Sequence, residues 1–269
     1  MQSHLHRFIV PAAGALALAA AGNALAQHAG DIGLATEAGA ITTHAIDAGG
    51  IGAAERVFLA TFGDTGSPNF TSNPGFDCVA GTFAVGTRVG FRFAGPLQVW
   101  DGATFVDTAP QGPLAGERVR VSFLTANATS GDVAAPGFDL AVQSNGGWHR
   151  HLSYTLLAAA GAASPDAGVY LLPLQMYSTD PAVAASQTLL LVMDAGADPQ
   201  SVADAAAAAN ALLSPCPADL DGNGVVDGAD LGMLLGNWGG AGTGDIDGNG
   251  IVNGADLGAL HGAFGPCGA

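Results

Sequence analysis

The chain has 269 residues, of which 49% are hydrophobic and 11% are charged, and its formal net charge is −16. This composition is too apolar for a disordered polymer, and its 41 glycines interrupt any long helical bundle. All seven basic residues are arginines, against 23 acidic residues, which excludes nucleic acid and anionic membrane surfaces as partners because both would be repelled. Metal cations are the natural counter-charge. The length allows one medium domain followed by a small one.

Residues 1–26 have the features of a secretory signal peptide. A polar start with one cation, Arg7, precedes an apolar run from Phe8 to Ala21, and Ala24 and Ala26 form a small-residue cleavage site before Gln27. The apolar run is shorter than the ~20 residues that a membrane-spanning helix needs. We therefore expect a secreted protein, extracellular or at the cell surface, in a compartment that permits disulfides.

Residues 27–197 are predicted to form a mainly β domain. Apolar residues alternate with other residues in 89–93 and 119–123, and more continuous apolar runs follow at 169–176 and 188–193. Glycine, proline, asparagine and aspartate between these runs indicate turns. The favoured fold class is an antiparallel β-sandwich.

Histidines are the chemically distinctive residues of this domain. His149 and His151 are separated by one residue at the expected start of a strand, so both imidazoles would share a face and reach one metal ion. His28, with Asp31 or His44, would supply the remaining ligands of a zinc site. Alternatively, these are solvated or hydrogen-bonded histidines on loops.

Three short motifs of the domain are similar to those of a known group of proteins. They are His28-x-x-Asp31, His149-x-His151 and Gly168-Val-Tyr170-Leu. The set resembles secreted, histidine-bearing β domains of zinc-regulated bacterial surface proteins. This resemblance implies a domain that binds a ligand or a transition metal.

Residues 198–215 are predicted to form a capping helix and a linker. Asp198 is a suitable N-cap, Pro199 suits the first helical position, and an alanine-rich stretch runs to Leu213 before Pro215. Among the cysteines, Cys78 has no obvious partner and is expected to be a small buried residue or an intermolecular thiol.

The strongest pattern is a loop repeated with an offset of 26 residues in the C-terminal segment. Both copies fit the calcium-loop pattern, in which side-chain oxygens at positions 1, 3, 5, 9 and 12 and a backbone carbonyl at position 7 bind Ca²⁺. A glycine at position 6 allows the sharp turn. The predicted ligands are Asp219, Asp221, Asn223, Val225, Asp227 and Asp230, and then Asp245, Asp247, Asn249, Ile251, Asn253 and Asp256.

Each loop is followed by apolar residues at helical spacing, which predicts a short helix after each loop. Val226 and Val252, at position 8, are expected to face one another as a small β-bridge. This order of loop, helix, connector, loop and helix resembles a dockerin over residues 216–269. The resemblance implies two bound Ca²⁺ ions and attachment to a cohesin-like or cell-surface protein.

Dockerin ends lie close together, so the resemblance also implies a disulfide between Cys216 and Cys267, which bracket the repeat. The positions that bind cohesins in dockerins are here Gly228-Ala229 and Gly254-Ala255, and no lysine or arginine follows Arg150. The segment carries seven aspartates, so we expect its folding to be coupled to the cation.

No nucleophile elbow, phosphate loop or zinc-protease helix is present in the sequence. The sequence therefore favours a secreted, non-catalytic protein with a ligand- or metal-binding β-sandwich and a dockerin-like module. The alternative is a component of an extracellular polysaccharide-degrading assembly, either a carbohydrate-binding module with an exposed tryptophan platform or a glycoside hydrolase.

Overall fold

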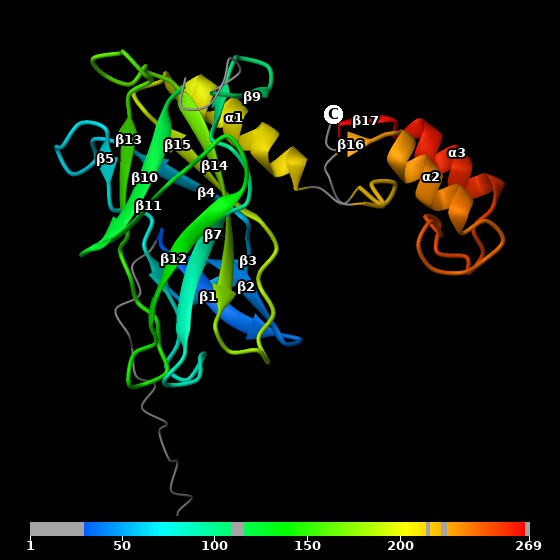
Figure 1. Cartoon of the computed structure of the whole chain (residues 1–269), viewed down its shortest axis with the longest axis horizontal. Coiled ribbons are helices and arrows are strands. Elements are labelled where there is room, and N and C mark those ends of the chain that lie inside the picture. The colour runs from blue at the N-terminus through cyan, green and yellow to red at the C-terminus, as the bar shows by residue number, and fades with distance from the viewer. Residues whose placement is uncertain (1–29, 109–115, 214–215, 222–224, 267–269) are drawn as a thin grey trace, which may run out of the picture.

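The computed structural model describes residues 30–108, 116–213, 216–221 and 225–266, so the expected signal peptide at residues 1–26 lies outside the described residues. The described chain is mainly β, as predicted. Its strands belong to several sheets, and the two helices near the C-terminus lie apart from the β-rich part in Figure 1. Within the described ranges, no helix combines the length and hydropathy needed to cross a bilayer.

Two four-stranded sheets contribute to the β-rich part. One has the order β3-β2-β1-β6, with β1 (Ile32–Glu37), β2 (Ala40–Asp47), β3 (Gly50–Ala54) and β6 (Phe76–Asp77). The other has the order β11-β10-β13-β5, with β5 (Phe70–Thr71), β10 (Arg118–Phe123), β11 (Ala126–Thr129) and β13 (Ser153–Leu157).

A seven-stranded sheet has the main order β12-β7-β14-β15-β4, with β8 paired to β14 and β9 paired to β8. Its strands are β4 (Val57–Thr61), β7 (Arg88–Phe93), β8 (Gln98–Trp100), β9 (Phe105–Asp107), β12 (Ala135–Ala141), β14 (Val169–Ser178) and β15 (Leu189–Asp194). The β4–β15 and β1–β6 pairs run parallel. The predicted antiparallel pairing therefore holds for most neighbouring strands, and these two parallel pairs depart from it.

Burial on both faces explains why β14 and β15 have nearly continuous apolar sequences. Alternate residues of β15, such as Leu191, enter the main core, which draws buried side chains from all three large sheets. The intervening Leu190 and Val192 form a second cluster with Ala205 and Ala209 of α1 (Pro199–Leu212). The helix thus covers the face of the sheet that turns away from the main core.

The C-terminal segment contains α2 (Gly228–Gly236), α3 (Gly254–Gly262) and a two-stranded ribbon of β16 (Val225–Val226) and β17 (Gly265–Pro266). Its own small cluster of buried residues consists of Ala218, Val226, Leu234, Val252 and Leu260. The two predicted helices are therefore present, each directly after a loop.

The valines at position 8 do not form the predicted bridge with one another. Val226 pairs with Gly265, which follows α3, in the β16–β17 ribbon. Val252 instead exchanges backbone hydrogen bonds with Gly239 and Gly240, which follow α2. Each loop therefore pairs with the segment after the other loop's helix.

Candidate metal centres

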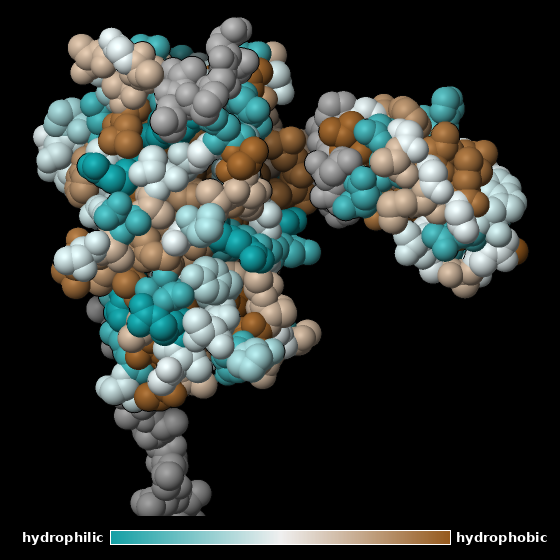
Figure 2. All heavy atoms as spheres, viewed as in Figure 1, coloured by the Kyte–Doolittle hydropathy of each residue, from teal (hydrophilic) through white to brown (hydrophobic). Residues whose placement is uncertain are grey.

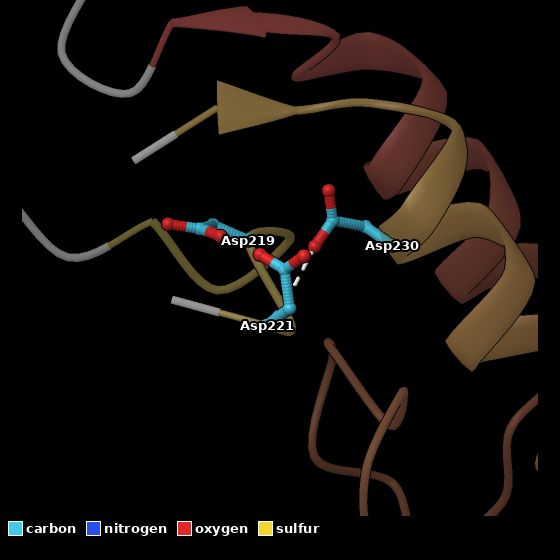
Figure 3. Close-up of side chains that lie close together, drawn as sticks. All are labelled: Asp219, Asp221 and Asp230. Carbon is cyan, nitrogen blue, oxygen red and sulfur yellow. Dashed lines mark hydrogen bonds between the residues drawn. The ribbon is translucent and has the colours of Figure 1, made fainter. Parts of the chain in front are cut away.

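Two clusters of aspartates occupy equivalent places in the repeat. Asp219, Asp221 and Asp230 form the first, and their ligand atoms lie within 4.8 Å of one another. Asp245, Asp247 and Asp256 form the second in the same way. Figure 3 shows the first cluster, with Asp230 projecting from α2 toward the loop that carries Asp219 and Asp221. Both clusters can hold a metal ion, because three hard oxygen donors converge.

Asp230 is fully buried and organises the first loop through its two oxygens. Its Oδ1 accepts hydrogen bonds from the backbone N–H groups of Leu220, at 2.7 Å, and Asp221, at 3.2 Å. Its Oδ2 accepts from Asp227 N at 2.8 Å. Since a carboxylate oxygen can accept two bonds, Oδ2 keeps capacity for a cation.

Asp256 repeats this arrangement in the second loop. Its Oδ1 accepts from Ile246 N at 2.7 Å and Asp247 N at 3.1 Å, and its Oδ2 accepts from Asn253 N at 2.8 Å. It too is fully buried. The two loops therefore share one internal hydrogen-bond pattern, built by residues at the same loop positions.

The residues at position 9 also start the two helices. Asp227 is the N-cap of α2 and accepts from Ala229 N, and Asn253 is the N-cap of α3 and accepts from Ala255 N. With Asp230 and Asp256 at N3, each helix begins with a capping box. The helix start thus fixes where the carboxylate of position 12 points.

Backbone hydrogen bonds keep both position-12 carboxylates ionised. The N–H of Asp227 makes the largest contribution to a lowered pKa of Asp230, and the N–H of Asn253 does the same for the pKa of Asp256. An accepted hydrogen bond favours the charged form of a carboxylate. Neither group therefore has to lose a proton before it binds a cation at neutral pH.

The second loop contains an oxygen that suits a cation. Asp245 Oδ2 accepts a hydrogen bond from Gly250 N at 2.8 Å, whereas Asp245 Oδ1 is buried and has no hydrogen-bond partner within the described chain. Gly250, at position 6, has a φ of 92°, which favours glycine. A buried carboxylate oxygen without a donor is costly, and a bound cation would compensate for it.

The contacts of the other predicted ligands say less about a cation site. Asp247 accepts from Asn249 N and Nδ2, and the carbonyl of Ile251 accepts from Asn253 Nδ2 at 2.9 Å. In the first loop, Val225 lies in β16, and Asn223 is outside the described residues.

The cysteines divide into two kinds. Cys216 is disulfide-bonded, while its predicted partner, Cys267, lies outside the described residues. Cys78 is a free thiol, 1% exposed, which agrees with its prediction as a small buried residue. Burial raises the pKa of Cys78 to about 11, so the reactive thiolate is scarce at neutral pH.

The predicted histidine site is brought together only in part. His149 and His151 lie on either side of Arg150, with ring centroids 5.3 Å apart, and His151 approaches Asp31. His44 lies in β2, where its ring contacts Thr42 and Glu37. His28 is outside the described residues.

The histidine group includes a carboxylate that the sequence pattern did not identify. Asp77 Oδ2 lies 3.2 Å from His149 Nδ1. Asp77 is separated from His149 by more than seventy positions, so no local spacing indicated the pair. Arg150 forms an isolated bridge with Phe76, and β13 begins only at Ser153, so the predicted strand start at His149 is displaced.

An exposed sugar-binding platform would be expected around Trp100 or Trp148, but neither ring is fully exposed. Trp148 is 1% exposed and packs edge-on against Phe76. Trp100 is half-buried and packs against Phe105, with ring centroids 5.2 Å apart. The described geometry therefore gives no support to stacking of a sugar on these rings.

Comparisons with family models, with curated proteins and with solved structures found no match.

Proposed function

We propose that this is a secreted protein in which residues 216–269 form a dockerin-like module that binds two Ca²⁺ ions. Residues 27–197 form a β-sandwich domain that the module attaches to a partner. The observation that carries the proposal is the duplicated hydrogen-bond pattern of Asp230 and Asp256 beside two aspartate triads. Hard carboxylate oxygens in a glycine-turned loop suit Ca²⁺ better than softer metals.

The donor set favours calcium over magnesium. Each loop offers several carboxylates together with amide and backbone oxygens, and Ca²⁺ accepts six to eight such ligands in flexible geometry. Mg²⁺ demands near-octahedral geometry and loses its water reluctantly. The orphaned Asp245 Oδ1 supports an ion in the second loop, and the matching pattern supports one in the first.

An attachment role is supported by apolar surface on the helical pair. Leu235, Trp238 and Phe264 are each about half exposed, and Figure 2 shows hydrophobic patches over this unit. A pocket of about 390 Å³ lies between α2 and α3, lined in part by Leu231, Leu257 and Phe264. A cohesin-like or cell-surface protein with an apolar face would fit, since this module has no lysine or arginine.

The test is a calcium titration of the full-length protein by isothermal calorimetry after treatment with a chelator. We expect two Ca²⁺ per chain, one in Asp219→Ala/Asp230→Ala and one in Asp245→Ala/Asp256→Ala. Asp204→Ala, which removes an exposed aspartate of α1, should still bind two. Absence of calcium binding, or a stoichiometry unchanged in both double variants, would contradict the proposal.

A further inference from the structure

A second group of metal-ligating side chains lies on one face of three neighbouring backbone segments. β1 and β6 are parallel, with Ile32 beside Phe76 and Gly33 beside Asp77. Phe76 also exchanges both backbone hydrogen bonds with Arg150, at 2.8 and 2.9 Å. Ile32, Phe76 and Arg150 therefore lie side by side in one row. Since side chains alternate along extended backbone, the residues directly before and after these three share the opposite face. They are Asp31, Gly33, Gly75, Asp77, His149 and His151.

One glycine in this set, Gly75, leaves room for the imidazole of His151. A Cβ added to Gly75 would lie 2.7 Å from Cε1 of His151, so only glycine lets the ring occupy its place. From there, His151 Nε2 reaches to 3.4 Å from Asp31 Oδ2. In the second histidine–aspartate pair, His149 Nδ1 lies 3.2 Å from Asp77 Oδ2.

Both carboxylates are held in the same way. Asp31 Oδ1 accepts a hydrogen bond from Gly75 N, and Asp77 Oδ1 accepts one from Cys78 N, each at 2.8 Å. The Oδ2 atom of each therefore faces an imidazole. The aspartate side chains are only 3–4% exposed, whereas those of His149 and His151 are 37% and 29% exposed. The buried acids are fixed, and the histidines lie between them and solvent.

Both ring nitrogens of His151 lie near oxygen atoms that accept hydrogen bonds or bind cations. Its Nδ1 lies 3.1 Å from the carbonyl oxygen of Ser72, which can only accept, so Nδ1 carries a hydrogen. Its Nε2 faces a second acceptor, the Asp31 carboxylate. A metal ion placed at Nε2 would therefore also lie beside the Asp31 carboxylate. A histidine that donates from one nitrogen to a backbone carbonyl while the other binds a metal is the usual arrangement in metal sites.

We propose that Asp31, Asp77, His149 and His151 bind one divalent transition-metal ion, with zinc as the preferred occupant. Two neutral imidazoles and two carboxylates match the nitrogen and oxygen ligands of tetrahedral zinc sites, and the two negative charges balance one divalent ion. The nearby Arg150 guanidinium does not compete, because it lies over the rings of Phe123 and Trp148.

Closing the site on an ion requires side-chain rotation. Within the described chain, only the aspartate triads of the C-terminal repeat bring three ligand atoms within 4.8 Å of one another. Hydrogen bonds hold Oδ1 of both aspartates, so the imidazoles of His149 and His151 would have to turn to bring all four ligand atoms onto one ion. Compared with the sequence-based set, Asp77 replaces His44, whose ring is held by Thr42, Gly52 and Glu37.

The experiment uses the full-length protein, stripped of metal and returned to saturating calcium so that the aspartate loops are occupied. Zinc retained after dialysis against a micromolar supply is measured by mass spectrometry, and calcium is counted in the same sample. We expect one zinc per chain in the wild type. His149→Ala/His151→Ala should lose it, and Gly75→Ala should bind at least about tenfold more weakly because its Cβ displaces His151.

Two controls separate ligand loss from misfolding. His261→Gln changes an exposed histidine of α3 and should retain the zinc. Asp77→Asn keeps the size of the side chain, and its fold is checked by near-ultraviolet circular dichroism. Cobalt substitution should give the visible absorption of a tetrahedral ion in the wild type and lose it in Asp77→Asn. Equal zinc in the wild type and the double histidine variant, with folding intact, would overturn the proposal whatever the calcium count.

Discussion

The side chains of Asp230 and Asp256 each have three structural roles. Each is the N3 residue of a capping box, accepts three backbone hydrogen bonds and belongs to an acidic triad. A glutamate at this position would carry its carboxylate further from the helix start. The aspartate instead ties the beginning of the loop to the beginning of the helix, which explains why it is fully buried.

One glycine in each of the paired strands β7 and β12 has a packing function. A Cβ on Gly90 would lie 2.3 Å from the backbone oxygen of Phe138, and one on Gly137 would lie 2.2 Å from that of Phe91. No real Cβ tolerates such distances, so the two strands approach closely only because both residues are glycines.

We therefore expect Gly90→Ala to destabilise the protein by about 1–3 kcal/mol or more, since overpacking against backbone cannot be relieved by a rotamer change. Thermal unfolding monitored by circular dichroism measures the change. Gly131→Ala is the matched control, because its nearest neighbour is 3.7 Å away, and it should stay within about 0.5 kcal/mol of the wild type. A wild-type unfolding temperature for Gly90→Ala would show that the strands can separate at little cost.

At the scale of the element, α1 is stabilised by its N-cap and its contact with the seven-stranded sheet. Asp198 Oδ1 accepts from Gln200 N and Ser201 N, and its Oδ2 accepts from the Ser201 hydroxyl. The hydroxyl of Ser201 makes the largest contribution to a lowered pKa of Asp198. A group with a lowered pKa stabilises the fold above its unfolded pKa and loses this effect as the pH falls through its folded pKa.

This linkage predicts a pH-dependent effect of Asp198→Ala. At pH 7 the variant should unfold at a lower temperature than the wild type, because the N-cap is lost. The difference should shrink as the pH falls below about 4, where the wild-type carboxylate becomes protonated. Asp198→Ser, which keeps a capping oxygen, should fall between the two at pH 7. Parallel curves from pH 7 to pH 3 would contradict the role of the charge.

Elements with a strong local pattern were predicted closely. The alternating segments became β7 and β10, the apolar runs became β14 and β15, and Asp198-Pro199 opened α1. The repeated acidic loops were identifiable because all the predicted ligands of each lie within twelve consecutive positions. Local sequence suffices where the geometry is local.

Pairings between distant segments were not predictable in the same way. The parallel β1–β6 pair and the Phe76–Arg150 bridge create the histidine group, and Asp77 was missed because neither contact has a local pattern. The exchange of partners by Val226 and Val252 was missed for the same reason. The repeat shows that two similar loops exist but does not show which segment each one pairs with.

At the scale of the whole molecule, the two parts differ in what stabilises them. The β-rich part has a large shared core and a second cluster under α1, whereas the described residues of the C-terminal segment contribute five buried hydrophobic residues to their own cluster. So small a core leaves little free energy to oppose repulsion among seven aspartates.

We therefore expect scanning calorimetry of the full chain to show a calcium-sensitive and a calcium-insensitive transition. Each ion should stabilise the C-terminal module by about 2.7 kcal/mol when calcium is at a hundredfold excess over its Kd. Adding EGTA should lower the midpoint temperature of this module's transition, and the midpoint temperature of the β-rich part should not change. A single transition that shifts as a whole would instead indicate that the two parts unfold together.

The exchanged backbone pairing in the repeat bears on how such a module can arise. The loop before α2 is completed by Gly265, after α3, and the loop before α3 is completed by Gly239 and Gly240, after α2. One copy alone would leave its own loop edge and its own tail without partners. A chain carrying a single repeat would therefore need a second copy of itself to supply both backbone pairings.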